Sequence, residues 1–183
     1  MRAAWYTRNG AARDVLVVGE LPTPSPGRGE VRVRLATSGV NPSDVKSRLG
    51  RPLGAERVVP HSDGAGTIDA VGADVPARRV GERVWIWNGQ WQRPMGTAAE
   101  FIVVPDAQAV ALPDAIDAAA GACLGIPAMT AFHAVARSTA TMSGRPTPMR
   151  CGPCFQLNIA QSERGRNSAS RKSHWSHTKT STP

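Results

Sequence analysis

Polar and apolar residues alternate along short segments in the first two thirds of the chain. In Glu30–Leu35 (EVRVRL) the alternation has a period of two, which is typical of a strand with one buried face. The apolar run Val15–Val18 predicts a buried strand. Three more segments predict strands: 64–71, 83–87 and 99–104. Because many short strands with turn residues between them favour a barrel or sandwich, we expect a mainly β domain with short helices.

Proline and glycine mark the turns of this domain. The segment Pro22–Gly27 (PTPSPG) predicts a loop, because its three prolines can neither donate to a strand ladder nor continue a helix. Pro42 suits the first turn of a short helix that ends near Leu49. Three glycines predict bends or close backbone contacts around the second strand segment: Gly64, Gly66 and Gly72.

The pattern changes twice after residue 113. From Asp114 the chain becomes Ala-rich, and Gly125 and Pro127 predict a break between two helices. From Arg137 the apolar residues follow neither a helical nor a strand period, and Ser and Thr provide 14 of 47 residues. Because such a composition cannot offset the entropy of folding, we expect residues 137–183 to be disordered.

Net charge separates the same two parts of the chain. The whole chain carries +8, from 22 Lys and Arg against 14 Asp and Glu. Residues 137–183 hold eight of the basic residues and one acid, so they contribute +7 and residues 1–136 contribute +1. A nearly neutral folded domain argues against nucleic acid as its partner.

The sequence shows no sign of a membrane anchor or a disulfide framework. No segment has the about 18–20 uninterrupted apolar residues of a membrane-spanning helix, and the N-terminus lacks the apolar run of a signal peptide. Three cysteines do not make the paired framework of a secreted domain. We therefore expect a cytoplasmic location and no membrane partner.

Three motifs together resemble the medium-chain dehydrogenase/reductase superfamily, in its zinc-free NADPH:quinone oxidoreductase (zeta-crystallin-like) branch. They are GVNPSD at 39–44, DGAGTIDAVG at 63–72 and LGIPAMTA at 124–131. The resemblance covers residues 1–136. It implies a GroES-like β-barrel, the alcohol dehydrogenase-type N-terminal domain, over 1–121, the start of the interdomain helix over 122–136, and a separate tail over 137–183. We expect the family's Rossmann domain to be absent, because no G-x-G-x-x-G turn follows residue 130.

Zinc divides this superfamily, and the residues predict a site without zinc. Zinc-dependent relatives have a Cys where this chain has Asn41 and a His where it has Ser62, and neither Asn nor Ser is a usual zinc ligand. His61 could be a ligand, but a lone His with no Cys or second His nearby is more often a hydrogen-bonded residue. The family's four-cysteine zinc lobe is also missing between Gln92 and Glu100.

The resemblance implies hydride transfer from NADPH to a quinone or an α,β-unsaturated carbonyl. Without a metal, such transfer needs mainly the positioning of cofactor and acceptor. Asn41 is expected beside the nicotinamide, although an Asn here also suits a helix cap. Thr130 is expected to contact the cofactor. Lys46 could contact a phosphate or the substrate, or it could be a solvated surface lysine, and the helix dipole alone explains Asp44.

Aromatic residues between positions 85 and 91 offer a flat surface for a planar acceptor. Trp87 and Trp91 are the candidate substrate contacts, and both flank the flexible Asn88–Gln90 turn. The alternative interpretation is barrel core, which applies to Trp85 and also to Trp87.

The tail contains two motifs that suggest other functions. Cys151 and Cys154 have the spacing of a redox or metal pair, and His174 with His177 could complete four ligands. The 19 residues between Cys154 and His174 exceed the about 12 of a zinc finger, which argues against zinc. A basic, Ser-rich tail could bind nucleic acid through phosphates alone. A frameshift or gene remnant explains the abrupt loss of pattern better than these alternatives.

Two hypotheses for function follow. The first is a truncated oxidoreductase, related to NADPH-dependent quinone and enone reductases and inactive alone because it lacks the nucleotide-binding half. The second is a non-enzymatic interaction or scaffold domain with a basic tail. On that hypothesis, the apolar surface of Ala118–Val135 is exposed and leads to self-association or to capture of another chain.

Overall fold

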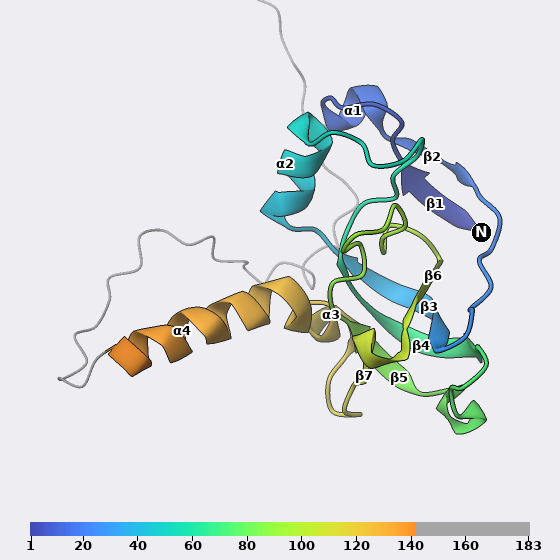
Figure 1. Ribbon diagram of the computed structural model, residues 1–183, viewed down its shortest axis with the longest axis vertical. Coiled ribbons are helices and arrows are strands. Elements are labelled where there is room, and N and C mark those ends of the chain that lie inside the picture. The colour runs from blue at the N-terminus through green and yellow to red at the C-terminus, as the bar shows by residue number, and fades with distance from the viewer. Residues whose placement is uncertain (142–183) are drawn as a thin grey trace, which may run out of the picture. The chain divides into compact units, whose positions relative to one another are not determined.

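The computed structural model describes residues 1–141, with side chains to residue 136. The strands of this part of the chain (Figure 1) are β1 (Arg2–Trp5), β2 (Val17–Glu20), β3 (Glu30–Gly39), β4 (Asp63–Val71), β5 (Arg83–Ile86), β6 (Phe101–Pro105) and β7 (Ala109–Ala111). The α-helices are α1 (Ala12–Val15), α2 (Pro42–Gly50), α3 (Ala118–Gly121) and α4 (Met129–Thr141). Three further short helical elements are η1 (Ala77–Arg79), η2 (Asp106–Gln108) and η3 (Leu124–Ala128).

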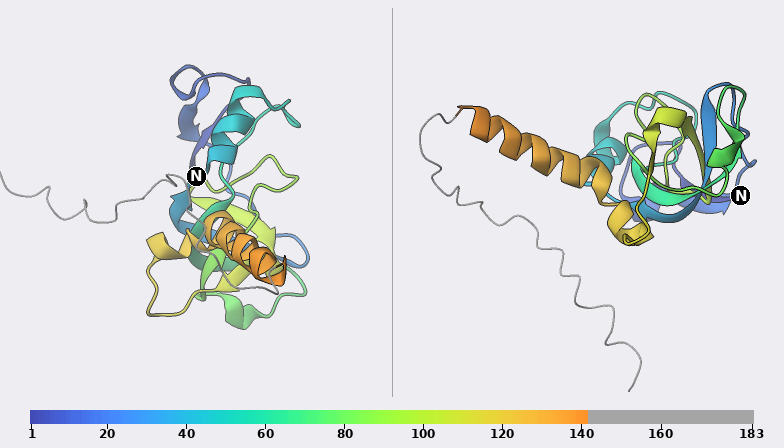
Figure 2. Two further views of the ribbon diagram at one scale, coloured as in Figure 1. Left: turned by 90° about the vertical axis from the view of Figure 1, so that its left-hand side faces the viewer. Right: turned by 90° about the horizontal axis from the view of Figure 1, so that it is seen from below.

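Five of the strands form one antiparallel sheet in the order β6-β3-β4-β5-β7, and β1 pairs with β2 separately. The sheet curls into a half-barrel (Figure 2). In the long β3–β4 pair the register shifts between Arg32 and Val33 and again between Leu35 and Thr37. Such irregularities bend a strand and increase its twist, so they help the sheet to curl. The mainly β, GroES-like fold predicted from the sequence is confirmed.

Apolar side chains of the five-stranded sheet form the main hydrophobic core. In β3, Val31 and Val33 are fully buried while Arg32 and Arg34 are more exposed, so the alternation predicted for Glu30–Leu35 is confirmed. The core residues with an exposed fraction of 0 or 1% are Val31, Val33, Ile68, Val84, Ile86, Ile102 and Val104. Burial of one such Val or Ile side chain contributes about 1.5–3 kcal/mol.

The predicted turn chemistry is also confirmed. Pro22–Gly27 contains no strand or helix, and the helix expected from Pro42 is α2. A Cβ atom on Gly66 would lie 2.0 Å from the carbonyl oxygen of Arg34, and one on Gly72 would lie 1.7 Å from that of Gly27. Only glycine allows the neighbouring backbone to pass this close.

The buried strand predicted at Val15–Val18 is wrong. Val15 ends α1 and is buried, whereas Val17 and Val18 lie in β2 with exposed fractions of 49% and 67%. β2 pairs only with β1, in a two-stranded sheet outside the main core. An apolar run cannot reveal that its strand has one neighbour and a solvent-facing side, because that depends on the tertiary arrangement.

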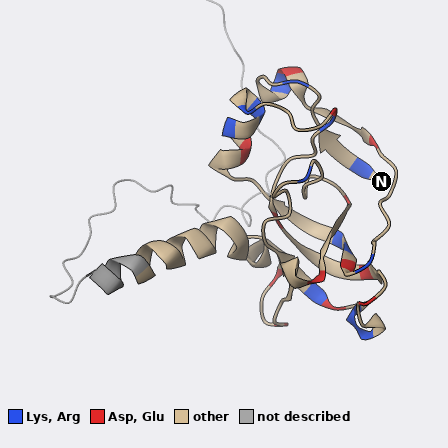
Figure 3. Cartoon of the chain, in the orientation of Figure 1, with Lys and Arg blue, Asp and Glu red and all other residues tan. Residues whose placement is uncertain are grey.

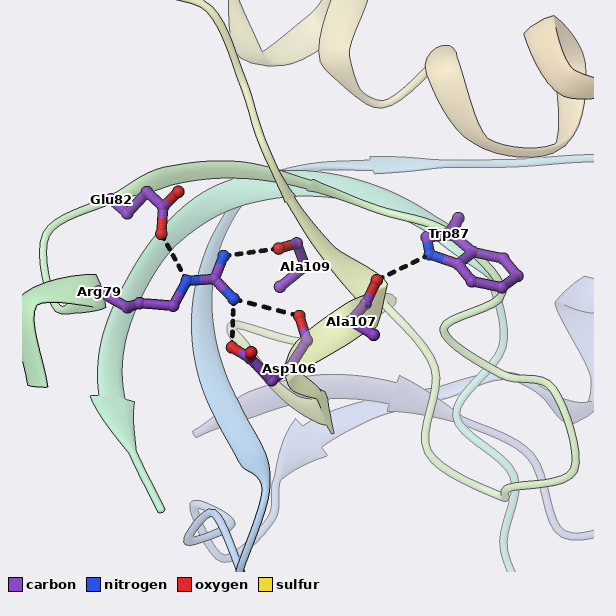
Figure 4. A network of polar contacts seen from close by, with 6 residues as sticks. All are labelled: Arg79, Glu82, Trp87, Asp106, Ala107 and Ala109. Atoms are coloured by element: carbon purple, nitrogen blue, oxygen red, sulfur yellow. Dashed lines mark hydrogen bonds and ion pairs between the residues drawn. The ribbon is translucent and has the colours of Figure 1, made fainter. Parts of the chain in front are cut away.

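A network centred on Arg79 holds together the segments on either side of β5 (Figure 4). Its guanidinium donates to the Glu82 carboxylate over 2.6 Å, to the carbonyl oxygen of Ala109 over 2.7 Å and to the Asp106 carboxylate. The indole N–H of Trp87 donates to the carbonyl oxygen of Ala107 over 3.2 Å. The η2 segment is therefore fixed on one side by Arg79, and it holds the Trp87 ring on the other.

Two helices follow the sheet and are separated as the sequence predicts. α3 packs on the barrel, where Ala122 joins Ala65 and Leu112 in a small apolar cluster. The backbone kinks at Gly125 within η3, and α4 then extends away from the sheet (Figure 2). Residues 129–136 of α4 include no Lys, Arg, Asp or Glu (Figure 3). The helix continues to Thr141, so residues 137–141, which were expected to be disordered, are helical.

The Cys151/Cys154 and His174/His177 motifs lie outside the described residues, as does most of the predicted tail. The division of the chain at residues 121 and 136 stays a prediction. Among the described residues, no helix has both the length and the apolar character that crossing a bilayer requires.

Candidate active site

Asp63 connects three separate parts of the fold, and we did not expect it to be a site residue. It is the first residue of β4, and its side chain is fully buried. One carboxylate oxygen accepts from the Asn41 amide over 2.8 Å, and the other accepts from the backbone N–H of Ile126 over 3.0 Å. A Cβ on Gly125 would lie 2.2 Å from that second oxygen. The missing side chain of Gly125 therefore lets η3 approach the carboxylate.

Asn41 occupies the N-cap position of α2 and is buried. Its backbone N–H donates to the Asp44 carboxylate over 2.7 Å, which satisfies a donor at the start of the helix. Its side-chain amide donates to Asp63. The alternative interpretation of Asn41 as a capping residue is thus supported by its position, and the nicotinamide contact stays a prediction.

A chain of hydroxyl groups leads from His61 to the backbone of Asp63. The Ser38 hydroxyl lies 2.9 Å from Nδ1 of His61 and 2.9 Å from the Thr97 hydroxyl. Thr97 is fully buried and donates to the carbonyl oxygen of Asp63 over 2.6 Å. His61 has a φ of 78°, a left-handed backbone that is uncommon for a residue with a side chain. These contacts hold His61 in that conformation.

Burial controls the protonation of this cluster. Desolvation raises the pKa of Asp63, while hydrogen bonds from Ile126 and Asn41 act in the opposite direction. Desolvation also raises the pKa of Asp44. For His61, burial lowers the pKa, and the nearby Asp44 and Asp63 carboxylates only partly oppose it. The imidazole is therefore mainly neutral at pH 7.

A cavity of about 310 Å³ lies against this cluster, and we call it the Trp87 cavity. Its lining residues are Trp87, Asn88, Gly125, Ile126, Met129, Thr130 and His133. The structure thus brings together two of the predicted site residues, Trp87, which directly follows β5, and Thr130 from the start of α4. Gln108 supports the barrel side, because its amide donates to the carbonyl oxygens of Trp87 over 3.1 Å and Asn88 over 3.3 Å.

Two other predicted site residues lie elsewhere. Trp91 has an exposed fraction of 62% and does not line the Trp87 cavity. Lys46 is exposed on α2 and does not line it either. Their roles as substrate and cofactor contacts stay predictions that the geometry does not favour.

Sequence reasoning missed His133 as well as Asp63. Met129, Thr130 and His133 stand at helical spacings of three and four residues, which places them on one face of α4. That spacing was a usable signal. For Asp63 the only signal was a charged residue at the start of a glycine-rich strand.

Within the described residues, no group of three His, Cys, Asp or Glu side chains is arranged to hold a metal ion. The Asn41 amide is bonded to Asp63, and Nδ1 of His61 is bonded to Ser38. The absence of zinc stays a prediction.

Comparison with known proteins places these features in a family. Residues 27–114 match the alcohol dehydrogenase GroES-like domain. The quinone oxidoreductase of Lama guanicoe is 30% identical over 146 residues, which cover 79% of this chain and 43% of that protein. The quinone oxidoreductase of Pseudomonas syringae pv. tomato DC3000 superposes with a TM-score of 0.69 at 27% identity, over 79% of this chain and 42% of that one.

A mycobacterial protein solved in complex with NADPH gives a TM-score of 0.63 at 28% identity, over 78% of this chain and 41% of that one. The chain therefore spans less than half the length of each of these relatives. Residues 27–114 form a GroES-like domain of the alcohol dehydrogenase type, and the chain belongs to the medium-chain dehydrogenase/reductase superfamily, in which it is similar to the N-terminal part of quinone oxidoreductases.

Proposed function

We propose that this domain binds the nicotinamide end of NADPH together with a quinone or α,β-unsaturated carbonyl acceptor, for hydride transfer without zinc. The relatives support the class of reaction, because two of those compared are quinone oxidoreductases and a third was solved with NADPH. The chain spans less than half of each of these proteins, so hydride transfer by this chain is a proposal.

The observation that carries the proposal is the meeting of Trp87 and Thr130 in one cavity. Its volume of about 310 Å³ is near the lower limit for ligand pockets, so it fits planar rings and not a whole dinucleotide. When bound, NADPH supplies the hydride. The Trp87 indole offers a face for stacking, and the hydroxyl of Thr130 and the amide of Asn88 offer polar contacts to a carboxamide or carbonyl group.

Positioning is the main contribution of these residues, because hydride transfer to an electron-poor acceptor needs reacting atoms held in near contact. Asp63 fixes Ile126, which lines the cavity, and its other carboxylate oxygen accepts from Asn41, which is not among the lining residues. The zinc-free part of the proposal rests on Asn41 and Ser62, which stand where zinc-dependent relatives have ligands. Elemental analysis of the purified protein tests it, and one tightly held zinc ion per chain would contradict it.

We further propose that the domain alone has little reductase activity. Its cavity fits only the ring end of the cofactor, and the sequence offers no Gly-rich turn for the pyrophosphate. Remote contacts of this kind supply much of the binding energy that orients a reacting ring.

Titration of tryptophan fluorescence with NADPH and with reduced nicotinamide mononucleotide tests both parts of the proposal. If only the ring end is bound, both compounds quench with the same affinity, in the range of about 1 mM. Trp87→Phe should remove most of the response, and Trp91→Phe is the matched control because Trp91 lies outside the cavity. No saturable response to either compound would exclude cofactor binding by this chain.

A second candidate function is an interaction domain that self-associates through α4. Met129 and Phe132, three residues apart, have exposed fractions of 38% and 70%. Within the predicted apolar surface Ala118–Val135, Gly121 and Ala122 are buried, whereas Ala119 and Ala120 are exposed as predicted. A mass that rises with concentration in light scattering would favour this function, and a monomer at all concentrations would exclude self-association.

A further inference from the structure

A second cavity, which we call the Tyr6 cavity, lies at the C-terminal end of α2. Its volume is about 330 Å³, and none of its lining residues lines the Trp87 cavity. It is enclosed by Tyr6 from the start of the chain, by the 47–55 segment at the end of α2, and by the 90–94 loop. The residues used below are Tyr6, Ser47, Arg51, Leu53, Val58 and Arg93.

The charge of this cavity is entirely positive. Its lining includes two arginines, Arg51 and Arg93, and no Asp or Glu. Arg51 is exposed at the rim, and the ion pairs found among residues 1–136 do not include it. Its guanidinium is therefore available to a ligand.

Arg93 adds a positive charge that the protein does not neutralise. One guanidinium nitrogen donates to the Gln108 side chain, and Nη1 is buried with no hydrogen-bond partner. Burial lowers the pKa of Arg93, and the more distant Glu30 only partly opposes this effect. Arg93 is half-buried, and the ion pairs found among residues 1–136 do not include it, so its charge favours an anion in the cavity that it lines.

Two residues with hydroxyl groups, Tyr6 and Ser47, also line the cavity. Tyr6 has an exposed fraction of only 3%, and burial raises the pKa of its phenol. Arg48 and Arg51 oppose that rise in pKa, whereas the Asp44 carboxylate adds to it. Ser47 supplies a second hydroxyl in the last turns of α2. Both groups can donate hydrogen bonds to an oxyanion.

Another part of the lining is apolar. Leu53 and Val58 contribute aliphatic surface, and Pro52 and Pro94 extend it. Inorganic ions gain nothing from such a surface, whereas an organic acid can bury its carbon skeleton there. A pocket with a few placed polar groups and apolar walls is the usual form of a small-molecule site.

We propose that the Tyr6 cavity binds a small organic carboxylate with an apolar body. The carboxylate pairs with Arg51, in the field of Arg93 and within reach of the Tyr6 and Ser47 hydroxyls, and the body packs on Leu53 and Val58. Arginine suits this role because its guanidinium can hold a carboxylate through two parallel hydrogen bonds. The site is separate from the proposed hydride transfer and does not depend on it.

An NMR titration of the full chain with three probes tests the proposal, because the probes are expected to bind with different affinities. Benzoate should shift the backbone amides of Ser47 and Gly54, which line the cavity, in a saturable manner. Benzyl alcohol, which keeps the ring without the charge, should bind at least tenfold more weakly, and so should inorganic phosphate. Equal binding of benzyl alcohol would overturn the charge argument, and equal binding of phosphate would overturn the apolar one.

Variants then locate the site. Arg51→Gln should weaken benzoate about tenfold, which corresponds to the loss of one charge-assisted pair. It should leave the fold intact, because the contact found for Arg51 with Asn9 uses its backbone oxygen. Tyr6→Phe should weaken benzoate a few-fold. Arg78→Gln is the control, because it removes the same charge from exposed η1 outside the cavity. Equal affinity in Arg51→Gln and Arg78→Gln would exclude the proposed site, whether or not NADPH binds elsewhere.

Discussion

The Trp87 cavity has two sides of different construction. On the barrel side, Asp63 is fully buried and bonds both Asn41 and Ile126, and Gln108 bonds the backbone of Trp87 and Asn88. The helical side consists of Met129, Thr130 and His133 on the first turns of α4, which are exposed. The barrel side is thus held by hydrogen bonds in the interior, and the helical side is held mainly by its connection through η3.

This difference assigns separate tasks to the two sides. Groups that position a reacting ring must be rigid, because small displacements reduce the rate of transfer strongly. The barrel side meets that requirement through buried polar contacts. The exposed helix can adapt to a ligand or to another protein surface, since few interior contacts limit its movement. Substitutions on each side should therefore differ in their effect on stability.

The largest effect is expected for Asp63→Ala. The substitution leaves the Asn41 amide and the Ile126 N–H without acceptors in the interior, and we expect a loss of about 3 kcal/mol in the free energy of unfolding. Urea denaturation measures it. Asp114→Ala is the control, because Asp114 is fully exposed and the substitution removes only its ion pair with Arg83, in which the charged atoms lie 3.6 Å apart. Equal stability of Asp63→Ala and the control would show that the barrel side is not held by Asp63.

Gly125→Ala should have the next largest effect. The new Cβ would lie 2.2 Å from the Asp63 carboxylate, so η3 must move away, at a cost of about 2 kcal/mol. Gly50→Ala is the control, since nothing lies within 4 Å of a Cβ at the end of α2, and there we expect about 0.5 kcal/mol of stabilisation. The backbone amide signal of Ile126 should also shift in Gly125→Ala alone. An unchanged Ile126 signal would contradict the close contact.

The range of each interaction explains how much of this could be predicted from the sequence. The alternation of β3 follows from local geometry and was predictable. For Gly66 and Gly72 the sequence predicted a bend or a close backbone contact, but it could not name the distant partners, Arg34 and Gly27. The bonds of Asp63 join residues 22 and 63 positions away, and no local pattern carries that information. Trp87 and Trp91 look alike in the sequence, yet Trp87 donates a hydrogen bond to η2 and lines the Trp87 cavity, whereas Trp91 does not line that cavity.

The pH dependence of stability should be smaller in size and should have two parts of opposite sign. Burial lowers the pKa of His61 below its ordinary 6.5, so the folded protein binds fewer protons than the unfolded chain there, and stability falls as the pH drops through 6.5. Burial raises the pKa values of Asp44 and Asp63 above 3.8. Their ionised forms therefore destabilise the folded protein at neutral pH, and this destabilisation is relieved as the pH falls toward 3.8.

Urea denaturation between pH 4 and pH 8 separates these two parts. His61→Asn keeps a residue that tolerates a left-handed backbone, and it should remove the decline below pH 7. Asp63→Asn should reduce the recovery toward pH 4 and leave the decline in place. If stability still declines below pH 7 in His61→Asn, groups other than His61 cause that decline.

The smallest effect on stability is expected on the helical side. Phe132 has an exposed fraction of 70%, and its ring contacts His133 edge-on, so Phe132→Ala should change the free energy of unfolding by no more than about 0.5 kcal/mol. If α4 binds a second copy, the same substitution should abolish concentration-dependent association, as measured by sedimentation velocity. Val18→Ala is the matched control, because Val18 is 67% exposed on β2. A loss of stability near that of Asp63→Ala would mean that the helical side is as firmly packed as the barrel side.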